Sequence, residues 1–139
     1  MTNAVLEAIR TRRVARSLTD APVERALVEE ILKAARWAPS GGNRRLHRFV
    51  AVQDPMTLRL LRMVSPGMFQ HPQAVVVICI DGQRARSFGM LPTAKGLYVD
   101  IGTAAQTMQV TAEMLRVLRG EKPHVLGNPD LWPKLGHLR

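Results

Sequence analysis

The sequence predicts an α+β fold in which helices surround a small sheet. Apolar residues recur at three- and four-residue spacing in several segments, as they do on the buried face of an amphipathic helix. Two short runs between these segments indicate strands: residues 47–53, with Phe49 and Ala51 on one face, and the unbroken β-branched run at 74–80. The resulting order is helix, helix, strand, helix, strand, helix, which is neither all-helical nor a regular alternation.

Length and composition fit one domain. The chain has 139 residues, of which 46% are hydrophobic and 22% charged, as in an ordinary globular protein. We expect the domain to cover residues 1–120. Residues 121–139 contain prolines and glycines without a clear period, which predicts an irregular C-terminal tail.

The N-terminal part is predicted to form two helices. The first covers residues 4–16, with Thr2 or Asn3 as its N-cap. The second covers residues 23–37, where an apolar stripe recurs at helical spacing. The stripe consists of Val23, Leu27, Ile31 and Ala34.

The middle of the chain predicts both strands. A loop at 39–43 precedes a strand at 47–53, and a short helix is expected at 55–64. The unbroken β-branched run at 74–80 predicts a central strand that is covered on both faces. Cys79, the one cysteine of the sequence, falls in this run, and we expect it to be buried as a small apolar residue.

The longest helix is predicted near the end of the domain. Residues 82–94 are expected to form a loop, and residues 95–118 a helix with small residues that allow another element to approach closely. Its apolar stripe consists of Ile101, Ala104, Ala105, Met108, Ala112 and Leu115.

No metal site is predicted. A single cysteine allows neither an internal disulfide nor a cysteine-based metal site. The histidines do not recur at ligand spacing, and we interpret them as surface or turn residues. They are His47, His71, His124 and His137.

The strong positive charge points to anionic partners. The formal net charge is +9 and the sequence pI about 11.2, which favours nucleic acid, anionic membranes or phosphorylated small molecules. A basic surface that only keeps the protein soluble is an equal alternative. The sequence shows neither a signal peptide nor an apolar run that would span a bilayer, so we expect a cytoplasmic protein without membrane association.

An arginine cluster stands at the end of the first predicted helix. It reads Arg12-Arg13-Val14-Ala15-Arg16. Arg12 and Arg16 are four residues apart, so they would share a helix face and could grip one phosphate. The alternative is a solvated basic face.

A second motif follows the second predicted helix. It reads Pro39-Ser40-Gly41-Gly42-Asn43. Its glycines would let the backbone approach a ligand, while the Ser40 hydroxyl and the Asn43 amide could bond the polar edge of a heterocycle. The alternative is an ordinary turn after a helix.

In this order the two motifs resemble the start of the nitroreductase-like flavoproteins. The segments Ser65–Gln70 and Asp100–Val110 resemble the family's pocket-lining loop and long central helix, so the resemblance covers about residues 4–120. After Asn43 the family often has Gln-Pro-Trp, whereas this chain has Arg45-Leu46-His47.

The resemblance implies an α/β/α sandwich with helices around a small mixed sheet, in an FMN-binding domain over residues 1–120. It also implies that the C-terminal part of the family fold is missing, so that the chain is a shortened member. No side chain need act as a catalytic acid or base, because the flavin performs the chemistry. The implied FMN contacts are Arg12, Arg13, Val14, Arg16, Pro39, Ser40, Gly41 and Asn43.

The implied function is that of an FMN-dependent oxidoreductase that works as a homodimer. Electrons would pass from NAD(P)H through the flavin to a nitroaromatic, a quinone or a similar small acceptor. Two alternatives remain. The chain could be an inactive remnant or interaction module of the same fold. It could also bind nucleic acid through its basic N-terminal half, although an aromatic content of 4% argues against a surface that stacks bases.

Overall fold

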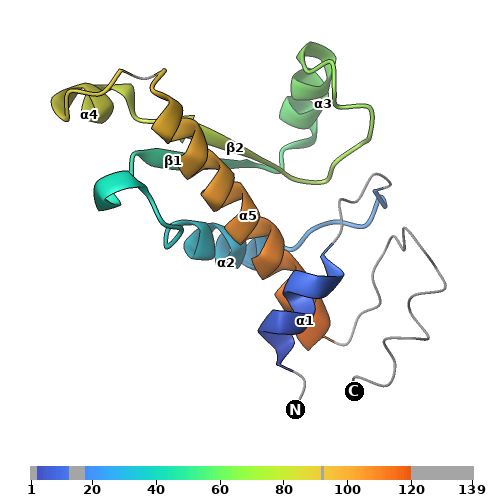
Figure 1. The fold of residues 1–139 in the computed structure, drawn as a ribbon. Coiled ribbons are helices and arrows are strands. Elements are labelled where there is room, and N and C mark those ends of the chain that lie inside the picture. The colour runs from blue at the N-terminus through green and yellow to red at the C-terminus, as the bar shows by residue number, and fades with distance from the viewer. Residues whose placement is uncertain (1–2, 13–17, 92, 120–139) are drawn as a thin grey trace. The chain divides into compact units, whose positions relative to one another are not determined.

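A computed structural model describes residues 3–12, 18–91 and 93–119. Its helices and strands are shown in Figure 1. They are α1 (Ala4–Thr11), α2 (Arg25–Ala35), β1 (His47–Val52), α3 (Pro55–Val64), β2 (Val75–Ile80), α4 (Gly82–Ser87) and α5 (Lys95–Leu118). The chain divides into two compact units, one of residues 1–18 with 109–139 and one of residues 19–108.

In the first unit, α1 is shorter than predicted. Asn3 caps it, because its side chain accepts a hydrogen bond of 2.9 Å from the Val5 N–H. The helix ends at Thr11, since Arg12 has an extended backbone with ψ 130°. The prediction of one helix over 4–16 is therefore wrong, because Arg12 is not helical. The prediction that Arg12 and Arg16 share a helix face is wrong for the same reason. The Arg12 guanidinium instead donates to the Gln109 side chain at 2.7 Å.

In the second unit, β1 and β2 form an antiparallel pair, visible as a two-stranded ribbon in Figure 1. The register runs from His47 opposite Ile80 to Val52 opposite Val75. Helices precede, separate and follow the two strands along the chain, in the order that the sequence predicts apart from the additional α4. Within the described residues the sheet contains these two antiparallel strands and no parallel pair.

The expectation that the second strand is covered on both faces is wrong. Along β2 half-buried and exposed side chains alternate, and both Val77 and Cys79 are exposed. Successive side chains of a strand point to opposite faces, so in this two-stranded sheet one face of β2 stays uncovered. Cys79 is accordingly exposed rather than a buried core residue.

The core of the second unit lies where the end of β2, α4 and the start of α5 meet. Leu46, Ala85 and Leu97 are each at most 1% exposed, and partly buried Ile80, Met90 and Ala94 pack against them. Helix α4 forms where a loop was predicted. Asp81 caps it by accepting the Arg84 N–H at 3.0 Å, and six residues are too short for a period to be visible in the sequence.

The remaining helices agree with the sequence more closely. Helix α3 has the predicted bounds, and Asp54 caps it by accepting the Thr57 N–H at 2.7 Å. Helix α5 also has the predicted bounds. Helix α2 is shorter than the predicted 23–37, and its most buried residues are Val28 and Ala35 rather than the predicted stripe. Among the described helices, none is long and apolar enough for a membrane span.

Candidate functional site

The loop after α2 adopts a compact, strongly bent conformation. Residues Gly41–Asn43 form a 3₁₀ turn, closed by a 2.8 Å hydrogen bond from the Asn43 N–H to the Ser40 carbonyl. Gly42 and Asn43 have φ of 60° and 54°, and Arg45 has φ of 49°. Glycine and asparagine accept this left-handed conformation more readily than other residues, which explains why they stand here.

Gly42→Val is expected to lower the free energy of unfolding by about 1–2 kcal/mol, because a β-branched side chain is disfavoured at positive φ. Steric space does not decide the outcome, since an added Cβ would meet only the flexible Arg44 side chain, at 3.4 Å or more. Gly42→Asn is the control and should cost much less. Urea denaturation of both variants measures the difference. Equal losses would show that the backbone conformation at Gly42 is not the cause.

Helix α5 holds the loop in place through two polar side chains. The buried carboxylate of Asp100, 7% exposed, accepts the Gly41 N–H at 3.0 Å. The Thr103 hydroxyl lies 2.9 Å from the Pro39 carbonyl and 2.8 Å from that of Asp100, and can donate to either. Sequence reasoning missed both residues. One signal was available: Asp100 stands one turn before Ala104, on the predicted buried face of the helix. A carboxylate buried there needs a hydrogen-bond donor, which would have predicted a contact with another element.

The Ser40 and Asn43 side chains are partly used inside the loop. Ser40 Oγ accepts the Arg45 N–H at 3.1 Å, and Asn43 Oδ1 accepts the Arg45 Nε–H at 3.0 Å. In both cases the oxygen acts as acceptor. The Ser40 hydroxyl proton and the Asn43 amide protons are not used in these bonds, so both side chains can still donate to a ligand.

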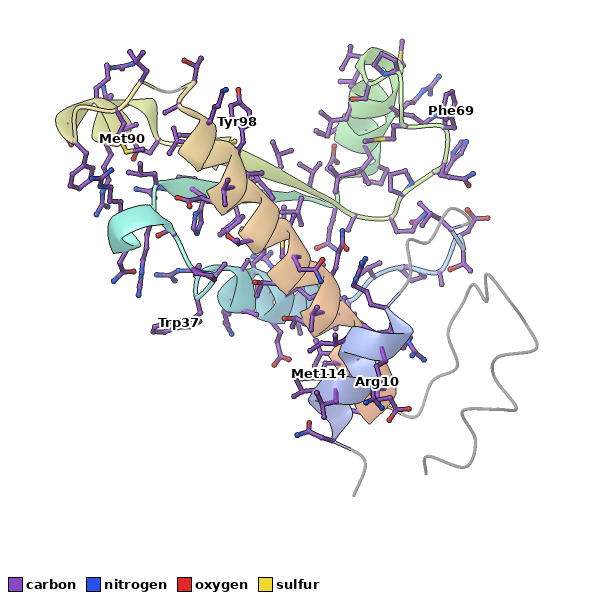
Figure 2. All side chains as sticks on the ribbon, viewed as in Figure 1. Arg10, Trp37, Phe69, Met90, Tyr98 and Met114 are labelled. Carbon is purple, nitrogen blue, oxygen red and sulfur yellow. The ribbon has the colours of Figure 1, made fainter. Side chains whose placement is uncertain are left out.

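Two arginines beside the loop rest on aromatic rings. The Arg44 guanidinium lies 5.3 Å from the Phe88 ring centre and also contacts the Met90 sulfur. The Arg45 guanidinium lies 5.2 Å from the centre of the Trp37 ring, which is 76% exposed. Figure 2 shows Trp37 extending away from the end of α2. Such stacking holds the positive charges beside the loop.

His47 is buried, against the expectation of a surface or turn histidine. It is 5% exposed at the start of β1, and its Nδ1 has no hydrogen-bond partner among the described residues. Burial lowers the pKa of His47 below its ordinary value, and Arg48 and Arg45 add to this, while Asp100 acts in the opposite direction. Burial therefore favours the neutral form of the ring.

Stability should fall on mild acidification because of His47. Its pKa is lower in the folded than in the unfolded chain, so the neutral ring contributes stability fully only above the unfolded value near 6.5. That contribution is lost as pH falls through the lowered pKa. His47→Gln should flatten this part of a curve of unfolding free energy against pH. An unchanged pH dependence in the variant would contradict the assignment.

The predicted site residues divide between the two units. Pro39, Ser40, Gly41 and Asn43 lie together in the loop of the second unit, whereas Arg12 belongs to the first. Arg13, Val14 and Arg16 lie outside the described residues, as do His124 and His137. His71 is exposed beside the Arg62 guanidinium. In the described part of the chain, no three histidine, cysteine or acidic side chains gather as metal ligands would.

Residues 9–81, just over half of the chain, match the nitroreductase family. The chain belongs to this family. The resemblance seen in the two sequence motifs is thereby confirmed. The curated relatives agree. A protein from Methanothermobacter thermautotrophicus, described as an NADH dehydrogenase/NAD(P)H nitroreductase, is 31% identical over 114 residues, which are 80% of this chain and 56% of the relative.

Further relatives support the same family. An NADH dehydrogenase from Thermus thermophilus is 38% identical over 78 residues, which are 56% of this chain and 38% of the relative. A crystal structure described as a nitroreductase in complex with FMN, from Desulfovibrio desulfuricans, superimposes with a TM-score of 0.68 at 28% identity. It covers 84% of this chain and 66% of the crystallised one.

These comparisons confirm the predicted nitroreductase-like α+β fold class. The chain spans about half or less of the curated relatives' length.

Proposed function

We propose that this nitroreductase-family chain binds FMN and passes electrons from NAD(P)H to a nitroaromatic, a quinone or a similar small acceptor. The observation that carries the proposal is the similarity to the FMN complex from Desulfovibrio desulfuricans, which extends over 84% of this chain. The names of the curated relatives support NAD(P)H as the donor.

The loop of the second unit fits the polar edge of a flavin. The pyrimidine side of the flavin ring presents carbonyl oxygens and ring nitrogens, which need hydrogen-bond donors. Ser40 and Asn43 retain donors that the loop does not use, and the positive charge of Arg45 lies beside them. A cation near this edge would favour the negative charge of the reduced flavin.

Each part of the loop would have one task. Ser40 and Asn43 would orient the ring, and the turn at Gly41 would let the backbone approach it closely. Asp100 and Thr103 would act as positioning residues, since they hold the loop from α5. When bound, FMN would supply the redox chemistry by taking up a hydride and releasing electrons to the acceptor.

The other predicted contacts complete the proposal. Arg12, Arg13 and Arg16 would meet the phosphate or the pyrimidine edge, with Val14 contributing its backbone, and Pro39 would border the ring. We also propose a homodimer in the cytoplasm and an FMN-binding domain that covers residues 1–120. Apart from the location, which is an expectation of the sequence analysis, these parts rest on the family resemblance alone.

Asn43→Asp tests the role of the loop. The change keeps the size of the side chain, its tolerance of positive φ and its acceptor oxygen, but removes both amide donors. We expect the dissociation constant for FMN, measured by quenching of flavin fluorescence, to rise about tenfold or more. Ser40→Ala should have a smaller effect in the same direction.

Asn3→Asp is the matched control, because it is the same chemical change at a helix cap where aspartate serves equally well. It should leave FMN affinity within about twofold of the unmodified chain. If Asn43→Asp binds FMN as tightly as Asn3→Asp, the Asn43 amide does not contact the flavin.

A further inference from the structure

A basic cavity of about 630 Å³ lies between α2, the start of β1 and α4, all within the second unit. Its size falls within the range of cavities that bind small molecules. Three elements contribute its walls. The lining residues are Glu29, Leu32, Lys33, Arg36, Arg45, His47, Arg48, Phe49 and Arg84.

The charge of the lining is strongly positive. Five of its side chains are lysine or arginine, against the single carboxylate of Glu29. That carboxylate is already engaged by Arg25 at 2.8 Å, and the pair holds the pKa of Glu29 below its ordinary value. Among the described residues, Arg36 and Arg84 make no ion pair. Arg36, at the end of α2, and Arg84 of α4 therefore border this cavity without an ion-pair partner within the described ranges, whereas Arg48 is paired with Asp81 at 3.0 Å.

The remaining lining residues indicate more than a solvated basic face. Leu32 and Phe49 are half-buried and provide an apolar wall. The ring of His47 also lines the cavity, and its buried Nδ1 lacks a partner in the described part of the chain. A buried polar atom without a partner is costly, and a bound ligand could relieve that cost after a small shift of the ring.

We propose that this cavity binds a small organic molecule that carries a diphosphate group. The cations come from three separate elements, so they can contact more than one phosphate of the same ligand. Each guanidinium group can bind two phosphate oxygens at once. The wall of Leu32 and Phe49 would cover the organic part of the ligand. This site goes beyond the proposed flavin function. Arg45 borders both the cavity and the flavin loop, so we assign the diphosphate to the other cations of the lining, which are Lys33, Arg36, Arg48 and Arg84.

Calorimetric titration with inorganic pyrophosphate, at constant ionic strength, tests the proposal directly. The unmodified chain should bind, and Arg36→Ala and Arg84→Ala should each weaken binding about tenfold. Arg86→Ala is the matched control, because it removes an exposed arginine of α4 that does not line the cavity. It should change the affinity by no more than about twofold. Equal weakening by all three variants, or no binding by the unmodified chain, would overturn the proposal.

Three further measurements characterise this cavity and separate it from the flavin site. The His47 ring nitrogens should shift in ¹⁵N NMR spectra when pyrophosphate is added, and Arg36→Ala should leave the FMN dissociation constant unchanged. Saturation with FMN should leave pyrophosphate affinity unchanged. If FMN displaces pyrophosphate, the cavity belongs to the flavin site and the proposal of a separate site is wrong. If the chain binds no FMN, pyrophosphate binding alone decides the question.

Discussion

Leu46→Ala should lower the free energy of unfolding by about 2–5 kcal/mol, the largest effect that we expect from a single substitution in the described fold. Leu46 is 1% exposed and packs with Ala85 and Leu97 in the core of the second unit. It lies three residues after Asn43 of the site loop, and its backbone carbonyl accepts the Asp81 N–H at 2.8 Å. Its truncation would therefore leave a cavity in this core.

Chemical denaturation of Leu46→Ala and Leu60→Ala gives the comparison. Leu60 lies on α3 and is 55% exposed, so the same truncation should cost less than about 0.5 kcal/mol there. Similar losses in both variants would mean that Leu46 is not a core residue.

Asp100→Ala should have the second largest effect, on stability and on FMN binding together. Without the carboxylate, the Gly41 N–H loses its acceptor, which we expect to cost about 1–3 kcal/mol in unfolding free energy. The loop would also lose one of its two links to α5. We therefore expect FMN affinity to fall about tenfold or more.

Asp100→Asn is the matched control for the loss of the hydrogen-bond acceptor. Its side-chain oxygen can still accept the Gly41 N–H, so stability and FMN affinity should lie close to those of the unmodified chain. Flavin titration and denaturation of both variants provide the test. If Asp100→Ala binds FMN normally, the link from α5 does not position the loop for the cofactor.

The long periodic segments of the fold could be predicted from the sequence. The bounds of α3 and α5 are as expected, and both strands lie within the segments predicted for them, 47–53 and 74–80. Helix α4 could not be found by its period, because six residues contain less than two turns. The end of α1 at Thr11 depends on the backbone of one residue, Arg12, which no spacing of side chains reveals.

Burial was harder to predict than secondary structure. An apolar run such as 74–80 does not reveal how many strands lie beside it, and β2 has one neighbour in the described part of the chain. Cys79 is consequently exposed. His47 was wrongly predicted to be exposed, because its burial depends on elements that only the folded chain brings together, among them Asp100 of α5.

The candidate site was predictable in part. The motif Pro39–Asn43 indicated a ligand loop, and the structure brings Ser40, Gly41 and Asn43 together in one turn. The residues that hold this turn, Asp100 and Thr103, lie about sixty residues later in the sequence. Their role depends on tertiary contacts between α5 and the loop, which the spacing of residues in the sequence does not reveal.

The most direct test of the proposed function is the visible spectrum of the purified, dialysed protein, with chromatography of any chromophore released on denaturation. We predict the absorption of an oxidised flavin and the release of close to one FMN per chain. A colourless protein that takes up no added FMN would contradict the account, and would favour a family member whose role does not depend on flavin.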